Sequence, residues 1–273
     1  MNLTQKIQKI GLLLKISYHL DFNKPLDVVL RYVMAFLICF SYTFFSKSIA
    51  QNSMEVHGHT VNLTFFIISG IALVRFVSIP LSMFKKTIAE LSIAGMTEWV
   101  QTTPTSIWEL FFAKTVWTFL TAFSEFMSCI IFTSFFAKIP LGLFINFWFL
   151  TSLVLVFVAY CGLGMMVLAL ILSFRRGSAL PPLISRLTFA FGGVFFPVAL
   201  LPVPIQFFSN ALPLTHALKV IRLCFVADTP ALIEPYLILI AVTVLNFAAG
   251  FALAEWSLSY GRSNGYLQRQ IVL

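Results

Sequence analysis

The stretch that decides the fold is GGVFFPVALLPVPIQFFSNALPLTH, residues 192–216. Four prolines interrupt this largely apolar stretch, at Pro197, Pro202, Pro204 and Pro213. Each proline removes one backbone amide donor and clashes with the preceding helical turn. Because backbone groups in lipid must be hydrogen-bonded internally, a single membrane-spanning helix is not expected to run through all four. We therefore expect the chain to break here into shorter helices.

The composition is that of a membrane protein. Of 273 residues, 59% are hydrophobic and 10% are charged, whereas soluble domains are about 25% charged. No long polar segment could fold separately, so one membrane domain is expected. The four cysteines show no CxxC spacing. We expect them to be small core residues rather than metal ligands or disulfide partners.

Six runs of apolar residues have about the length of 20 residues that a membrane-spanning helix needs. They lie near 28–50, 61–83, 107–136, 141–173, 183–201 and 232–256. The sequence therefore predicts an all-α membrane protein with about six transmembrane helices. The first run begins behind a polar leader, so no cleavable signal peptide is expected.

Lysine and arginine residues set the expected orientation, because cytoplasmic segments are enriched in them. With the N-terminus inside, twelve of the 18 lie in inside segments and four in outside loops, at Lys47, Lys138, Lys219 and Arg222. Both termini are therefore expected in the cytoplasm. The net charge of +8 then reflects membrane orientation, and no nucleic-acid partner is expected.

The leader, residues 1–27, has the pattern of an amphipathic helix. Leu3, Ile7, Ile10 and Leu14 share one helical face, and polar residues lie opposite. We expect an interfacial helix on the cytoplasmic leaflet. A helix packed on protein would show the same pattern.

A second amphipathic helix is predicted in the cytoplasmic loop between the second and third apolar runs, within about residues 86–104. Between Ile88 and Gln101 the apolar residues fall mainly on one helical side, and Glu98 lies on the other. Pro104 then ends the helix. Such an element can dock into a groove on a soluble partner. A plain interfacial connector is the alternative.

The proline-broken stretch lies, in this orientation, on the extracellular side. It contains two short apolar helices, about Pro204–Ala211 and Leu214–Val226, and neither is long enough to cross a bilayer. We expect a re-entrant helical hairpin over about residues 197–231, between the last two spans. Broken backbone at membrane depth must be buried in protein or line a cavity. The hairpin is therefore expected to be a gate or lid, or else a structural plug.

Two motifs in these stretches carry a family resemblance. The first motif is G-T-L-E-x-L-L-x-T-P. The stretch GMTEWVQTTP, residues 95–104, fits it at Gly95, Glu98, Thr103 and Pro104. The second motif is G-x-x-x-P-x-x-x-x-P followed by Gln, P-L-[ST]-[YH] and a downstream Arg. It is fitted by Gly193, Pro197, Pro202, Gln206, Pro213, Leu214, Thr215, His216 and Arg222. On these residues the chain resembles permease subunits of the ABC-2 type, the transmembrane half of bacterial ABC exporters. It is similar to the permeases of nodulation lipo-oligosaccharide and drug export.

The resemblance implies a transporter subunit and not an enzyme. Permeases of this family form two-subunit assemblies, here expected to be a homodimer, with two separate ATPase subunits that bind ATP and Mg. The chain has no G-x-x-x-x-G-K-[ST] motif, so no cofactor is expected in it. The expected cargo is amphipathic: a glycolipid, a lipid-linked saccharide or a hydrophobic drug-like compound. It would be exported across a bacterial cytoplasmic (inner) membrane, whose lipid surrounds the chain.

The resemblance also implies roles for particular residues. The coupling helix that receives motion from the ATPase is expected to use Gly95, Glu98, Trp99, Thr103 and Pro104. The extracellular gate is expected to use Gly193, Pro197, Pro202, Gln206, Pro213, His216 and Arg222.

A few charged residues fall outside these motifs. Arg75 and Glu125 are expected near mid-membrane, where charges are costly and face the bundle interior. They either pair structurally or line a polar part of the path. His57 and His59 could hold a metal together with Glu55, but histidines in a short exposed loop are usually solvated. No metal site is expected.

Three other function classes are weaker. An ion-coupled secondary transporter would need several midplane carboxylates, and Glu125 is nearly alone. A lipid-modifying enzyme would need clustered His, Asp or Glu at one interface, which the sequence lacks. A non-transporting assembly subunit with the same fold stays open.

Overall fold

The computed structural model describes residues 11–15, 17, 25–48, 53–56, 59–93, 107–137, 146–174, 179–224 and 229–263 of the chain. Most of the leader lies outside these residues. So does the motif expected to couple to an ATPase, with Gly95, Glu98, Trp99, Thr103 and Pro104. The roles expected of these residues stay predictions.

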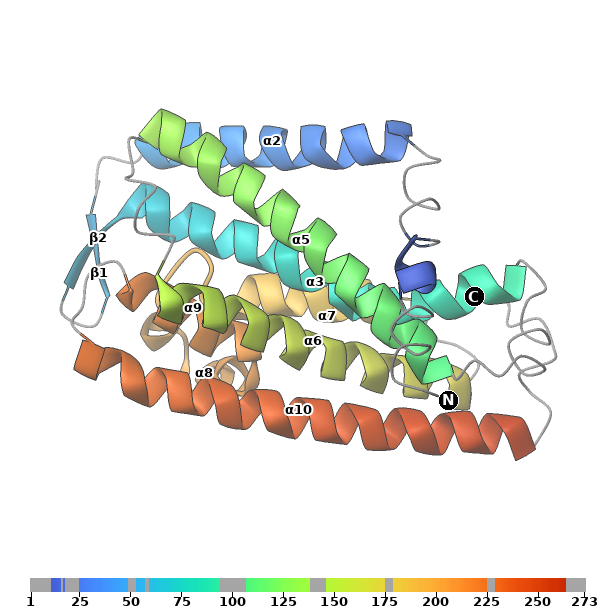
Figure 1. The fold of residues 1–273 in the computed structure, drawn as a ribbon. Helices are drawn as coiled ribbons and strands as arrows, with labels where there is room; N and C mark the ends of the chain where they lie inside the picture. Colours follow the sequence, from blue (N-terminus) through green and yellow to red (C-terminus); the bar gives the residue numbers. More distant parts are fainter. Residues whose placement is uncertain are drawn as a thin grey trace.

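Helices make up nearly all of the described chain (Figure 1). Within it, five are long and apolar enough to cross a membrane: α2 (Pro25–Ser48), α3 (Leu63–Ile93), α5 (Ile107–Ala137), α6 (Phe147–Phe174) and α10 (Thr229–Ser263). Four shorter helical elements lie between α6 and α10: α7 (Leu180–Phe191), η2 (Val198–Leu200), α8 (Val203–Ala211) and α9 (Pro213–Leu223). The all-α membrane class predicted from the sequence is confirmed.

The long helices give the bundle two distinct ends (Figure 1). At one, which we call the terminal end, lie the start of α2, the end of α3, the start of α5 and the ends of α6 and α10. At the other, the hairpin end, lie the opposite ends of these helices together with α9. Pro25 and Ser263, the outermost residues of the first and last long helices, therefore lie at the same end.

The fifth predicted span is wrong in length. Residues 183–201 were expected to cross the membrane, but α7 has 12 residues and so rises about 18 Å at 1.5 Å per residue. It begins with Pro181 and Pro182 in its first turn and ends at Gly192. The apolar run in the sequence is long enough for a membrane-spanning helix. Gly192 and Gly193, which lie inside this run, end the helix early.

Two other expectations need correction. Residues 53–62, expected as an exposed loop, contain a small antiparallel pair, β1 (Ser53–Val56) with β2 (His59–Asn62), in which Val56 pairs with His59. The helix expected to begin at Ile88 is not separate there, because α3 continues without a break to Ile93. Residues 82–93 contain no glycine or proline, so nothing in them ends the helix.

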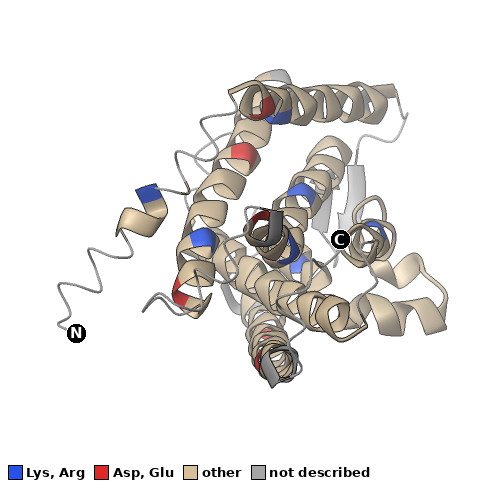
Figure 2. Ribbon diagram, turned by 90° about the vertical axis from the view of Figure 1, so that its right-hand side faces the viewer, with Lys and Arg blue, Asp and Glu red and all other residues tan. Residues whose placement is uncertain are grey.

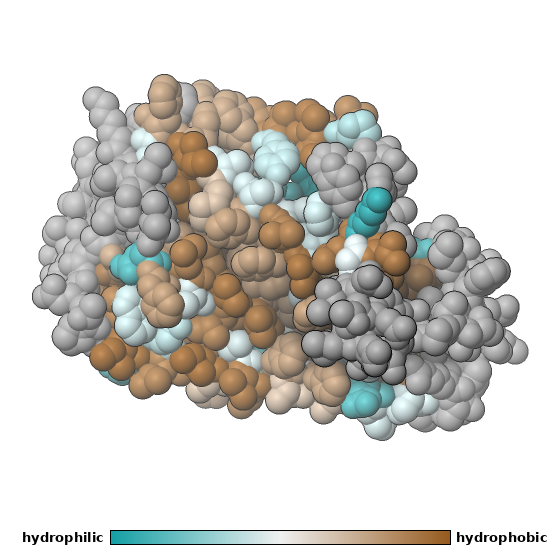
Figure 3. Space-filling view, in the orientation of Figure 1, coloured by the Kyte–Doolittle hydropathy of each residue, from teal (hydrophilic) through white to brown (hydrophobic). Residues whose placement is uncertain are grey.

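The core of the bundle lies around α3 and α6. In the most apolar part of α3, 83% of the residues are buried, and in α6 67%, against 17% in α2 and 28% in α10. On the face shown in Figure 3, brown apolar residues cover much of the described surface, and many large apolar side chains of α2 and α10 are exposed. Charged residues are sparse among these helices when the molecule is viewed from the terminal end (Figure 2). Such an exterior suits contact with lipid.

Helices α6 and α10 touch backbone to backbone. A Cβ atom added to Gly162 would lie 2.5 Å from the Asn246 carbonyl oxygen, and one added to Gly250 would overlap the Gly162 carbonyl oxygen. Small residues permit such close approach of membrane helices. The two helices therefore form one tightly packed unit.

Candidate functional site

The break in the chain after α7 depends on a glycine pair. The Gly192 amide donates to the Thr188 carbonyl and closes the last turn of α7. Gly193 then adopts a φ of +74°, a conformation that other residues rarely take without strain. A side chain there would also press on Val198. The chain can therefore turn sharply at Gly193.

Each proline of the motif lies at the start of a short element. Pro197 precedes η2, Pro202 precedes α8, and Pro213 is the first residue of α9. These are the positions where a missing amide donor costs nothing and the fixed φ favours a helix. The two helices expected near Pro204–Ala211 and Leu214–Val226 are present as α8 and α9.

Side chains of the hairpin bond carbonyls that the broken helices leave unpaired. The Gln206 amide donates to the Leu201 carbonyl at 2.7 Å and to the Ala199 carbonyl at 3.3 Å. The Thr215 hydroxyl donates to the Ser209 carbonyl at 2.6 Å. The Ser209 hydroxyl donates to the Phe191 carbonyl. Buried backbone groups need such partners, so Ser209 holds α8 against α7 and Thr215 holds α9 against α8.

Arg222 anchors the hairpin to the core. Its guanidinium donates to the carbonyl oxygens of Gly193 (2.8 Å), Val194 (3.1 Å) and Phe66 (2.9 Å). It also lies 3.4 Å from the centre of the Phe66 ring, where a cation is attracted by the ring face. Burial lowers the pKa of Arg222 to about 9, so the side chain stays charged at neutral pH. One side chain thereby joins α9, the Gly193 turn and α3.

His216 is buried and is held in its neutral form. Its Nε2 donates at 2.8 Å to the Asn210 carbonyl, so in the neutral ring Nδ1 carries no proton. Burial lowers the pKa of His216, and nearby Lys219 lowers it further, against the hydrogen bond to Asn210. Protonation would place a buried N–H at Nδ1, which has no hydrogen-bond partner among the described residues.

Acid is therefore expected to destabilise the hairpin. When folding lowers the pKa of a histidine, the folded state keeps its full stability above the ordinary histidine pKa of about 6.5, where the ring is neutral. Stability is lost as the pH falls from there through the pKa of the folded state. Labelling of the half-buried Cys224 with a maleimide should rise between about pH 6.5 and 5, relative to a free-thiol standard. His216→Gln, which does not titrate, should remove this rise. Equal pH profiles for the two proteins would contradict the assignment.

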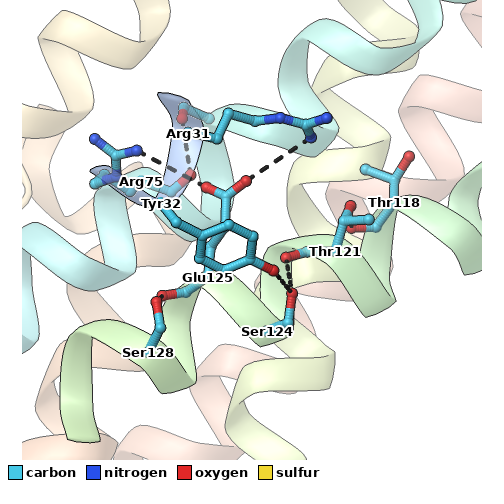
Figure 4. Close-up of polar contacts among 9 residues, drawn as sticks. Arg31, Tyr32, Arg75, Thr118, Thr121, Ser124, Glu125 and Ser128 are labelled. Carbon is cyan, nitrogen blue, oxygen red and sulfur yellow. Dashed lines mark hydrogen bonds and ion pairs between the residues drawn. The ribbon is translucent and has the colours of Figure 1, made fainter. Parts of the chain in front are cut away.

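The two charges expected within the membrane lie together. Glu125 of α5 is 3.8 Å from Arg75 of α3 through Oε2. Its Oε1 is 3.8 Å from Arg31 of α2 (Figure 4). The contact of Arg31 with Glu125 was not predicted from the sequence. A charge near the start of an apolar run was the signal that could have found it, because intramembrane charges seek partners.

A further ion pair lies at the terminal end. Lys114 of α5 donates to Glu90 of α3 at 3.2 Å. These two helices enclose residues 94–106 in the sequence, which carry the expected coupling motif. The ion pair thus holds the end of α3 against the start of α5, the two helices that residues 94–106 connect.

Residues 12–226 match the family described as ABC-2 type transporter. The chain belongs to the ABC-2 type transporter family. The match runs from the residues before α2 to those just after α9, so it includes the α8–α9 hairpin. An ABC-2 chain is a membrane permease subunit that associates with an ABC ATPase subunit. Comparison with curated proteins gives no match.

The described part of this ABC-2 chain contains no group of three or more His, Cys, Asp or Glu side chains that could hold a metal ion. Many of its buried hydroxyl groups donate to backbone carbonyls, whereas Arg75 Nε, His216 Nδ1 and Arg222 Nε have no hydrogen-bond partner among the described residues.

Proposed function

We propose that the chain is the permease subunit of an ATP-driven exporter of an amphipathic substrate. The cargo would be a glycolipid, a lipid-linked saccharide or a hydrophobic drug-like compound. The membrane would be a bacterial cytoplasmic membrane, with both termini in the cytoplasm. The family supports a permease, and the lysine and arginine distribution supports the orientation.

The observation that carries the proposal is the position of the α8–α9 hairpin. Its helix α9 packs against Leu232 and Tyr236 at the start of α10 and Trp148 at the start of α6. Residues 94–106, which follow Ile93 and precede Ile107, connect helix ends at the opposite end of the bundle. An ATPase at the terminal end and a gate at the hairpin end would then lie on opposite sides of the membrane.

The gate would be the α8–α9 hairpin itself. Helix α7 is too short to cross the membrane, and α8 and α9 pack against its last turn. The hairpin would therefore close the substrate path at the hairpin end of the bundle. Gly193, Pro197, Pro202 and Pro213 allow the breaks, while Gln206, His216 and Arg222 hold the pieces. A structure fixed by side-chain bonds to carbonyls can open by exchanging a few of them, without unfolding a long helix.

The assembly would contain two copies of this chain and two ATPase subunits that bind ATP and Mg. Helix α2 supports a second membrane partner, since large apolar side chains along it are exposed, among them Phe36, Phe44 and Phe45. The coupling residues would be Gly95, Glu98, Trp99, Thr103 and Pro104, in the segment that α3 and α5 enclose.

A pull-down with a transport assay tests this proposal. The tagged chain, purified from native membranes in mild detergent, should carry a P-loop ATPase, and inverted vesicles should take up an amphipathic dye when ATP is added. Glu98→Arg should lower the recovered ATPase and the uptake by about tenfold, as expected when a contact worth about 1.4 kcal/mol is lost.

The matched control is Glu234→Arg, which makes the same change of charge on an exposed residue of α10 near the hairpin end. It should leave ATPase recovery unchanged. Recovery of an ATPase without uptake of any amphiphile would favour a non-transporting assembly subunit. A chain free of ATPase would contradict the proposal.

A further inference from the structure

The cluster formed by Arg31, Arg75 and Glu125 carries more positive than negative charge. Two guanidinium groups face one carboxylate, and each of its oxygens is 3.8 Å from one of them. Figure 4 shows the carboxylate between the two arginines. Asp27, one turn before Arg31, is exposed and makes no ion pair with it. The cluster therefore has an excess of one positive charge.

The two arginines also have unused hydrogen-bond donors. A guanidinium carries five N–H groups. At 3.8 Å, both ion pairs are longer than the roughly 2.7–2.9 Å of a charge-assisted hydrogen bond. Arg75 Nε is buried and has no hydrogen-bond partner among the described residues. Buried donors of a charged group are normally satisfied, so the Glu125 carboxylate does not use the full hydrogen-bonding capacity of the cluster.

A half-open pocket adjoins the cluster between α2 and α5. Its volume is about 160 Å³, which is about five times the volume of a water molecule in the liquid. Polar and apolar groups share the lining, which consists of Val28, Arg31, Tyr32, Trp117, Leu120, Thr121, Ser124 and Glu125. Tyr32 and Ser124 bond each other at 2.7 Å across the two helices. The pocket thus offers a charged and hydroxylated part beside an apolar part.

The pocket lies at membrane depth and is open to the side. Glu125, on the lining, is twelve residues before Ala137, so it lies about 18 Å from the hairpin end of α5. Leu120, on the lining, is half exposed, as are apolar residues of α2. A molecule with a hydrocarbon chain can therefore enter from the lipid phase.

We propose that this pocket binds an anionic amphiphile, whose phosphate or carboxylate group lies beside Arg31 on the pocket lining and is attracted by the excess positive charge of the cluster. Guanidinium groups match the geometry of both anions. Val28, Trp117 and Leu120 would contact the first part of the chain of the amphiphile. The proposal concerns binding by this chain alone, so it does not rest on coupling to an ATPase.

A purely structural ion triad predicts different behaviour. In a triad, Glu125 serves to neutralise the arginines, and its removal should loosen the three helices. In a binding site, Glu125 competes with the ligand for the Arg31 guanidinium. Its replacement by glutamine should then strengthen binding of an anion. The sign of this change separates the two roles.

The experiment uses the purified protein in phosphatidylcholine vesicles. It measures how strongly dodecyl phosphate with a brominated alkyl chain quenches the fluorescence of Trp117. The signal of the Trp117→Phe variant is subtracted from that of the wild type. The difference reports the fluorescence of Trp117 alone. Dodecyl phosphate should bind about tenfold more tightly than brominated dodecanol, which has no charge. Glu125→Gln should tighten dodecyl phosphate binding by about fivefold, because one repulsive charge is removed.

Arg31→Gln is the second variant, and it leaves the Arg75–Glu125 pair intact, so the bundle keeps a balanced ion pair. It should abolish the preference for dodecyl phosphate. The matched control, Arg186→Gln, changes an exposed arginine of α7 and should keep the preference. Equal binding of the two amphiphiles to the wild type, or an unchanged preference in Arg31→Gln, would overturn the proposal.

The same experiment distinguishes two sources of the anion. If the occupant is a resident bilayer lipid, inclusion of phosphatidylglycerol in the vesicles should displace dodecyl phosphate from the pocket. If the pocket takes an amphiphile that arrives from solution, as a cargo would, quenching by dodecyl phosphate should persist in those vesicles.

Discussion

Gly250→Leu is expected to prevent normal packing of α6 on α10. Even the Cβ atom of alanine would overlap the Gly162 carbonyl oxygen, which belongs to backbone and cannot rotate away. The helices would have to separate along their whole contact. Gly250→Ala should cost about 3 kcal/mol, and Gly250→Leu should yield little folded protein.

The measurement is the thermal midpoint of the detergent-solubilised chain, followed by loss of the monodisperse peak in size-exclusion chromatography. For a chain of this size, each kcal/mol shifts the midpoint by about 2–4 °C. Gly11→Ala is the matched control, because nothing lies within 4 Å of a Cβ atom there. A midpoint for Gly250→Ala equal to that of Gly11→Ala would show that the two helices are not in backbone contact.

Arg222→Met is expected to release the α8–α9 hairpin from α3. Methionine keeps much of the apolar volume but removes the donor to the carbonyls of Gly193 and Val194, whereas the Phe66 carbonyl keeps the Ser69 hydroxyl as a donor. An unsatisfied buried carbonyl costs about 1–3 kcal/mol, so the loss from the Gly193 and Val194 carbonyls is about 2–6 kcal/mol. Arg222→Lys should restore part of it, since one ammonium group cannot reach all three oxygens.

Maleimide labelling of Cys224 measures this release, because the other three cysteines are buried. Labelling should be faster in Arg222→Met than in the wild type and intermediate in Arg222→Lys. Arg186→Met, at an exposed arginine of α7, controls for the loss of a charge. Labelling of Arg222→Met at the wild-type rate would contradict the anchoring role.

The long spans could be predicted because hydrophobic length alone decides them. Helices α2, α3, α5, α6 and α10 each coincide with a predicted apolar run. The same rule failed for α7, since it counts apolar residues and takes no account of Gly192 and Gly193. It also could not detect β1 and β2, which are four residues each and too short for a periodic signal.

The motif residues of the hairpin could be found in the sequence, but their contacts could not. The sequence places Arg222 in the motif, whereas its acceptor Phe66 lies 156 residues away. Arg31 and Glu125 are likewise far apart in the chain and meet because α2 lies along α5. Contacts of this kind depend on how helices pack, and a local pattern does not encode them.

The small buried fraction of α2 has a mechanical consequence. Only 17% of the residues in its most apolar part are buried. When the helix tilts or slides, most of its surface therefore stays in contact with apolar surroundings. Such a displacement therefore meets little resistance from packing. Its main resistance comes from Arg31 on Glu125 and Tyr32 on Ser124 near the start of α2, and from Ser46 on Thr64 of α3 near its end. Helix α2 is thus held mainly by a few polar contacts close to its two ends, while the apolar surface between them can shift against its neighbours.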